Sequence, residues 1–173
     1  MRRKKAKTPE IITFQTHWDA YSILGVEDKK CEPLKDPQCA ACWDEFFRVQ
    51  ADEKIGPLLK DKPLLGVFCT PEPGRWSFLV GAVVENIEVA PEGLCLRAIP
   101  ATEQLVVTHE WVPTTGESDA QIDRVADYAH SKDCKLPEGY ERCCDPILFT
   151  ECYNWDFDNK KFRFEVWLPI KSI

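Results

Sequence analysis

The same series of elements is predicted twice along the 173-residue chain, and this repeat limits the possible folds more than any other feature. A strand region at 10–26 precedes a helix at about 37–53 and two strands separated by the turn-rich "PEPG". A strand region at 94–112 precedes a helix at about 118–131 and two strands separated by "DNK". Each unit alone leaves its sheet half covered. We therefore expect an α+β fold in which two strand-helix-strand-strand modules share one antiparallel sheet, with the helices on one face and a cleft on the other.

Apolar spacing and end signals support both helices. The first is expected to start after Asp36-Pro37, and the second at Ser118, with Gln121 completing a capping box. Both carry an apolar stripe at helical spacing, formed by Cys39, Trp43, Phe46 and Phe47 in the first and by Ile122, Val125, Ala126 and Ala129 in the second. Both helices are therefore expected to pack against the sheet.

Charge is distributed unevenly along the chain. Five of the first seven residues are basic, which leaves 17 basic against 29 acidic residues in the remainder. Such an acidic body repels nucleic acid, so no direct nucleic-acid binding is expected, and residues 1–10 are expected to form a flexible basic tail. No apolar run reaches the roughly 20 residues that cross a bilayer, and no signal peptide follows the basic start. A cytoplasmic protein without a membrane partner is expected.

Nine cysteines raise the question of a metal or redox site. Cys39 and Cys42 form C-x-x-C at a helix start, and Cys134, Cys143 and Cys144 lie about a hundred residues further on. These spacings match no common zinc site, so buried reduced thiols, no metal and no cofactor are expected. The helix N-terminus could still lower the pKa of Cys39 and make this thiol reactive.

One carboxylate interrupts the apolar stretch "FTECYNWDF" at 149–157. On a strand, Phe149, Glu151, Tyr153 and Trp155 share one face, because successive side chains alternate sides. An ionised carboxylate among apolar side chains is costly unless a cation or a hydrogen-bond donor meets it. The partner of Glu151 is either an internal arginine or a ligand from outside, and the candidate arginines are Arg97, Arg142 and Arg163.

From about residue 11 onward, the chain resembles the GyrI-like small-molecule-binding family, which includes the effector-binding domains of AraC-type and MerR-type multidrug regulators. The similar stretches are "CWDEFF", "LLGVFCTPEPGRWSFLVGAVVE", "GLCLRAIPATEQLVVTHEWVPTTG", "DPILFTECYNWDF" and "KFRFEVWLPIK". The most specific parts are Asp145-Pro146, Glu151-Cys152-Tyr153 and "EVWLPI" at 165–170. The resemblance implies a single domain of two pseudo-twofold modules, at about 11–93 and 94–173. It also implies a cleft between them, where an acidic residue among aromatic rings holds bulky, often cationic compounds.

Two departures from the family change these expectations. Many members carry a Y-x-x-Y stretch where this chain has "FCTPEPG", so part of the aromatic cage is expected to be rearranged or supplied by Trp76. The regulators also carry a DNA-binding domain ahead of this module, whereas only about ten residues precede it here. A standalone ligand-binding domain is therefore expected.

The residues expected to bind the ligand are Glu151, Tyr153, Trp111, Trp76, Trp167 and Phe149. A two-residue turn at Asp158-Asn159 would pair Tyr153 with Phe164 and would point Trp167 and Glu165 to the opposite face from Glu151. A slip of one residue would reverse this. Which side of the last strand faces the cleft is therefore left open.

The resemblance implies three functions. The first is a small-molecule binder that sequesters bulky aromatic, cationic or electrophilic compounds or senses them for a separate regulator. The second is a hydrolase of cyclopropane-bearing toxins, in which Glu151 would act as a general base or an electrostatic stabiliser. The third is an inhibitor with DNA gyrase as its protein partner. Of these three functions we favour the small-molecule binder, then the hydrolase, then the gyrase inhibitor.

Overall fold

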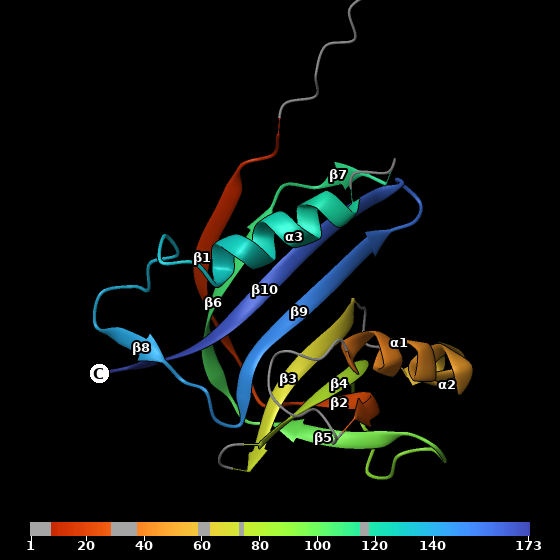
Figure 1. The fold of residues 1–173 in the computed structure, drawn as a ribbon. Helices are drawn as coiled ribbons and strands as arrows, with labels where there is room; N and C mark the ends of the chain where they lie inside the picture. Colours follow the sequence, from red (N-terminus) through yellow and green to blue (C-terminus); the bar gives the residue numbers. More distant parts are fainter. Residues whose placement is uncertain (1–7, 29–37, 59–62, 73–74, 115–117) are drawn as a thin grey trace, which may run out of the picture.

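The computed structural model describes residues 8–28, 38–58, 63–72, 75–114 and 118–173. The strands are β1 (Ile11–Trp18), β2 (Tyr21–Asp28), β3 (Leu64–Glu72), β4 (Arg75–Val84), β5 (Cys95–Ile99), β6 (Thr102–His109), β7 (Val112–Pro113), β8 (Tyr140–Arg142), β9 (Ile147–Asp156) and β10 (Lys161–Ser172). The helices are α1 (Gln38–Arg48), α2 (Ala51–Ile55), a 3₁₀ turn (Gly56–Leu58) and α3 (Ser118–Ala129). Figure 1 shows their arrangement.

In the described residues the strands form one sheet in the order β1-β6-β10-β9-β3-β4-β2-β5, and β7 and β8 add to β10. The pairings are antiparallel. The order has a twofold pattern, because β9 and β3 lie at its centre and β10 and β4, β6 and β2, and β1 and β5 occupy equivalent places on either side. The α+β fold of two related modules in one antiparallel sheet is thus confirmed.

The two modules exchange their first strands. β1 pairs with β6 along its whole length, from Ile11 opposite His109 to Trp18 opposite Thr102. In the equivalent place on the other side, β5 pairs with β2, from Tyr21 opposite Ile99 to Gly25 opposite Cys95. Each edge of the sheet is therefore closed by a strand from the other half of the chain.

Both long helices lie on the same face of the sheet, which we call the helix face. Helix α1 packs on β2 and β4, and α3 packs on β10 and β6 (Figure 1). One core joins both helices to the sheet, and its buried side chains include Leu24, Cys42, Phe46, Phe78, Leu105, Val107, Val125, Ala129, Phe164, Val166 and Leu168. The alternate residues of the strands form a second core on the opposite face, which we call the open face.

The first helical region is shorter than its apolar pattern predicts. Instead of one helix at 37–53, α1 ends at Arg48 and α2 starts at Ala51, because Gln50 adopts a left-handed conformation (φ 54) that a continuous helix cannot contain. The helix predicted at 118–131 ends at Ala129. Asp36-Pro37 and most of the basic tail lie outside the described residues. Among the described residues, no helix has the length and apolar character required to span a bilayer.

The register of the last hairpin decides which side chains share a face. Tyr153 pairs with Phe164 and Glu151 pairs with Val166, as a turn at Asp158-Asn159 predicts. Because Phe164 and Val166 belong to the core under the helices, Glu151 lies on the helix face. Trp167 belongs to the open-face core.

Candidate functional site

The carboxylate of Glu151 lies on β9, near the middle of the sheet, and is partly buried. The hydroxyl of Tyr153 donates a hydrogen bond of 2.8 Å to its Oε2. Burial raises the pKa of Glu151, and the hydrogen bond from Tyr153 opposes that shift. Within the described part of the chain, no Lys, Arg or His side chain lies within ion-pairing distance of this carboxylate.

The three arginines that could have paired with Glu151 all have other partners. The Arg97 guanidinium forms an ion pair with Glu27. Nη2 of Arg142 donates to the carbonyl oxygen of Leu148 at 2.7 Å. Nη2 of Arg163 lies 2.8 Å from Oε1 of Glu165. Each of these three arginines is therefore engaged elsewhere, and the hydrogen-bond donor that meets Glu151 is Tyr153.

Aromatic rings lie on the same face of the sheet as this carboxylate. The Tyr153 ring lies 5.3 Å edge-on from Trp43 of α1 and 5.1 Å from Phe164, between ring centroids. Further along β9, Phe149 stacks on Phe68 at 4.1 Å. Trp76 continues this stack at 5.8 Å from Phe68. We call Trp43, Trp76, Phe149, Glu151 and Tyr153 the helix-face cluster.

Both helices reach the helix-face cluster from opposite sides. Figure 1 shows β9 and β3 running between α1 and α3. Trp43 of α1 contacts Tyr153, and His130, just after α3, lies edge-on to Phe149 with ring centroids 4.5 Å apart. A ligand that displaced either contact would therefore touch a helix as well as the sheet.

Gly66 on β3 lies directly opposite Glu151 and leaves space for the carboxylate. A Cβ added to Gly66 would lie 3.3 Å from Oε2 of Glu151 and 2.9 Å from the Phe78 ring, closer than side-chain atoms normally approach. The absence of a side chain at Gly66 thus lets Glu151 and Phe78 lie close against the backbone of β3.

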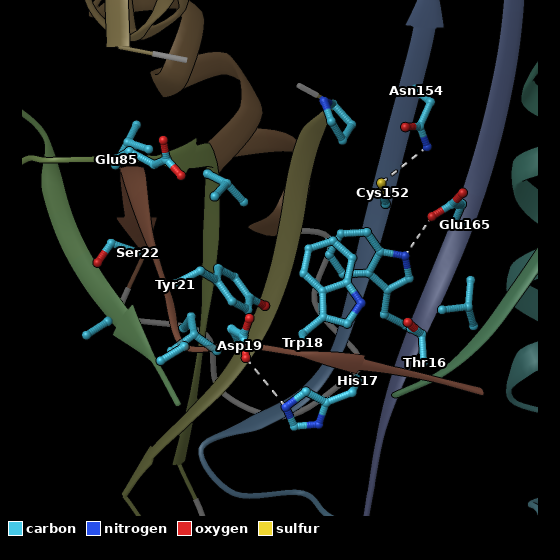
Figure 2. Close-up of a pocket in the computed structure, with 18 of the residues that line it drawn as sticks. Thr16, His17, Trp18, Asp19, Tyr21, Ser22, Glu85, Cys152, Asn154 and Glu165 are labelled. Carbon is cyan, nitrogen blue, oxygen red and sulfur yellow. Dashed lines mark hydrogen bonds and ion pairs between the residues drawn. The ribbon is translucent and has the colours of Figure 1, made fainter. Parts of the chain in front are cut away.

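A hollow on the open face has a volume of about 970 Å³. Trp18, Tyr21, Arg163, Glu165 and Trp167 are among its lining residues, and Figure 2 shows this cavity. Nε1 of Trp167 donates to Oε2 of Glu165 at 2.7 Å, and Arg163 pairs with the other oxygen. The Glu165 carboxylate is therefore bound by the residues two positions before and two positions after it on β10. A smaller hollow of about 290 Å³ is lined by Trp111 and Tyr153.

The six residues expected to bind the ligand are not brought together in one place. Four of them, Phe149, Glu151, Tyr153 and Trp76, lie in the helix-face cluster. Trp167 lines the open-face cavity, and Trp111 lies under the guanidinium of Arg163, 4.9 Å from its Cζ to the ring centroid. The open-face cavity and Glu151 are therefore on opposite faces of the sheet.

Three lining or cluster residues were not among those expected. Trp43 belongs to the apolar stripe of the first helix, and this pattern predicts packing on the sheet but not a contact with Tyr153. Trp18 and Tyr21 flank the two-residue break between β1 and β2, and their ring centroids are 5.7 Å apart. Two large aromatic residues at a strand break are a signal that could have suggested a role in lining a cavity. Their position in the sheet, however, depends on the exchange of first strands between the modules.

Comparison with known proteins finds the fold in solved structures, but no protein-family profile and no curated protein matches the sequence. The chain is similar to SAV2435 bound to tetraphenylphosphonium, with a TM-score of 0.68 and 13% identity over 92% of this chain and 94% of the other. It is similar to the EcmrR C-terminal domain, with a TM-score of 0.57 and 10% identity over 94% of this chain and 99% of the other. It is also similar to an integron cassette protein from the mobile metagenome of Vibrio cholerae. The TM-score is 0.53 and the sequence identity is 10%, over 92% of this chain and 95% of the other. This chain therefore has the fold of these solved structures, the GyrI-like fold.

Proposed function

We propose that the protein binds bulky aromatic cations on the helix face, with Glu151 as the counter-charge. The observation that carries this proposal is a partly buried carboxylate that is bonded to Tyr153, within a face rich in aromatic rings, and has no cation partner among the described residues. The three internal arginines that could have neutralised it are engaged elsewhere. A cation from outside is the partner that this environment lacks.

The surrounding groups suit a flat or bulky cation. The Tyr153 hydroxyl holds Oε2 of Glu151 at 2.8 Å and so fixes the direction of the carboxylate. The rings of Tyr153 and Trp43 offer faces and edges beside it, and a cation over such a ring gains ~0.5 to 2 kcal/mol. Charge and ring contacts together would favour aromatic cations over simple metal ions.

The comparison with SAV2435 supports the same class of ligand. That protein was solved with tetraphenylphosphonium, which carries one positive charge and four phenyl rings. At 13% identity the likeness establishes the fold, and the ligand class for this chain rests on Glu151 and its neighbours.

Binding of a cation should depend on pH through Glu151. Burial raises the pKa of Glu151, so a proton and the ligand cation compete for the same carboxylate. Affinity should therefore increase as pH rises through this raised pKa and then level off. With glutamine at this position, the dependence should disappear.

The test is calorimetric titration of tetraphenylphosphonium and of triphenylphosphine oxide, a neutral compound of related shape. Glu151→Gln should weaken binding of the cation by about 10-fold or more and change binding of the neutral compound far less, since a tenfold change is about 1.4 kcal/mol. Glu88→Gln, at an exposed glutamate, makes the same change in net charge and serves as the control. Unchanged binding of the cation to Glu151→Gln would refute the proposal.

A second candidate function is hydrolysis of strained electrophiles, and the raised pKa of Glu151 favours it. A carboxylate whose pKa is closer to neutrality is a better general base. Glu151 would take a proton from water as the hydroxyl adds to a cyclopropane carbon, and the electron pair of the broken ring bond would pass to a conjugated carbonyl that is then protonated. In this case Glu151→Gln would still bind a cyclopropane-bearing compound but consume it much more slowly, as product chromatography would record.

A further inference from the structure

The turn between β9 and β10 carries exposed aromatic side chains at one end of the sheet, close to β7 (Figure 1). Phe157 is 82% exposed, Trp155 is 42% exposed and Trp111 is 40% exposed. The rings of Trp155 and Phe157 stack, with centroids 6.3 Å apart and an angle of 14° between their planes. We call Trp111, Trp155 and Phe157 the hairpin-tip patch. Apolar rings gathered on a surface in this way mark an interaction site.

The smaller hollow, of about 290 Å³, lies within this patch, and all three rings line it. It lies where β3 begins at Leu64, opposite Tyr153, so that the last residues of β9 extend beyond the end of β3. Its volume is below the roughly 300–1,000 Å³ of pockets that enclose drug-sized molecules. The hollow therefore suits one large side chain better than a whole drug-sized ligand.

Hydrogen bonds hold the turn that presents Phe157. Oδ1 and Oδ2 of Asp156 accept from the backbone and side-chain amides of Asn159, at 3.0 and 2.8 Å. The backbone N–H of Thr114, just after β7, donates to the carbonyl oxygen of Lys160 at 3.0 Å. Phe157 therefore projects from a turn that is tied on both sides, and less conformational entropy is lost when its ring is buried against a partner.

The hairpin-tip patch is complementary to a second copy of itself. It presents an exposed ring, that of Phe157, beside a hollow, and a twofold interface requires such a projection and recess on one surface. Its charges are also of both signs, since Asp158, Lys160 and Lys161 are exposed close to Phe157 in the chain. Asp158 of one copy can meet a lysine of the other, whereas a uniformly charged partner would also meet a like charge.

We propose that two copies of this chain associate through the hairpin-tip patch, with Phe157 of each copy entering the hollow of the other. This places the partner's Phe157 beside Tyr153, which lines the hollow and donates a hydrogen bond to Glu151. In a second step, which rests on the proposed function, the partner's Phe157 adds a ring to the cation site. The dimer then binds tetraphenylphosphonium more tightly than the monomer does.

Sedimentation equilibrium of the full chain without ligand tests the dimer directly. The original protein should form dimers, and Phe157→Ser should weaken dimerisation by about 10-fold or more, the usual effect of removing a buried aromatic anchor. Val89→Ser is the matched control, because Val89 is 80% exposed and lies outside the patch, and it should leave dimerisation within about 2-fold. Both side chains are exposed, so both variants should fold, which urea unfolding checks.

Calorimetric titration of tetraphenylphosphonium tests the second step. At concentrations where the original protein is dimeric, Phe157→Ser should bind this cation roughly 2- to 30-fold more weakly, the contribution of one ring to a bound cation. Sedimentation without ligand decides the dimer whether or not the cation binds, so failure of the proposed function is distinguished from failure of this inference.

Three results would overturn the dimer. They are a protein that stays monomeric at about 100 µM chain, unchanged dimerisation of Phe157→Ser, and a monomer that instead sediments with phosphatidylcholine vesicles. Unchanged affinity of Phe157→Ser for tetraphenylphosphonium would refute the contribution of the partner's Phe157 to the cation site.

Discussion

The Tyr153 hydroxyl donates a hydrogen bond of 2.8 Å to the carboxylate of Glu151, which lies two residues earlier on the same strand. On the neighbouring strand, Glu165 is held instead by the cation of Arg163. The two carboxylates lie on adjacent strands but on opposite faces of the sheet, one against a neutral donor and one against a cation. They should respond differently when their charges are removed.

Glu151→Gln should not destabilise the protein near neutral pH and should stabilise it by up to about 1 kcal/mol, the scale of one hydrogen bond. The folded-state pKa of Glu151 is raised above 4.5, so this group stabilises the fold most when protonated. That contribution is fully present below about pH 4.5 and is lost as pH rises through the raised pKa. Urea unfolding at pH 4 and pH 8 should give a gain for Glu151→Gln at pH 8 only. A gain of the same size at pH 4 would contradict this.

Glu165→Gln should destabilise the protein by about 2 kcal/mol, because it weakens a charge-assisted bond and leaves the Arg163 cation partly unpaired. The side chain of Arg163 is 35% exposed, so water limits the loss. Urea unfolding of both glutamine variants at pH 8 makes the comparison. Equal stability of Glu165→Gln and the original protein would show that the ion pair contributes little.

Gly66→Ala should cost about 1–3 kcal/mol of folding free energy, since its Cβ would meet the Phe78 ring at 2.9 Å. The same Cβ would press on Glu151, so tetraphenylphosphonium binding should also weaken. Gly56→Ala is the matched control, because a Cβ there meets nothing within 4 Å and its backbone is right-handed helical. If both alanine variants melt at the same temperature, the close approach at Gly66 is not tight.

His109 should make the protein less stable in mild acid. Its buried ring accepts a hydrogen bond at Nε2 from the Phe164 amide, so Nδ1 carries the proton and donates to the Glu110 carbonyl oxygen, 2.6 Å away. Burial lowers the pKa of His109 below 6.5, so its contribution is present above about pH 6.5 and is lost as pH falls through the lowered pKa. Nitrogen NMR should find the Nδ1–H tautomer, and a proton on Nε2 at neutral pH would contradict this assignment.

Much of the fold follows from local patterns, whereas the site depends on distant ones. Alternation along 149–155 was enough to place Glu151 and Tyr153 on one face, and the turn at Asp158-Asn159 gave their register with the last strand. Where that face lies relative to the helices could not be read locally, because it depends on how β9 enters the sheet beside β3. The alternation therefore predicted which residues of β9 share a face with Glu151, but not whether that face lies under the helices.

A cleft on the face opposite the helices was expected, but most of the residues that line the open-face cavity could not be predicted. Its two tryptophans, Trp18 and Trp167, come from β1 and β10, which meet only because β6 lies between them in the sheet. Strand propensity and turn signals identify such segments but do not pair segments far apart in sequence. The partner of Glu165, in contrast, is within reach of local reasoning, because Arg163 lies two residues earlier on the same strand and therefore on the same face.

The exchanged first strands make each half of the chain an incomplete folding unit. A fragment of residues 11–93 would carry β1 with no β6 to pair with, and β2 with no β5 beside it. Because β1 and β5 occupy equivalent places, two copies of one half could complete each other by lending that strand reciprocally. A single-module relative of this protein would thus be an obligate homodimer, and covalent duplication would turn that association between two chains into an intramolecular one, independent of protein concentration.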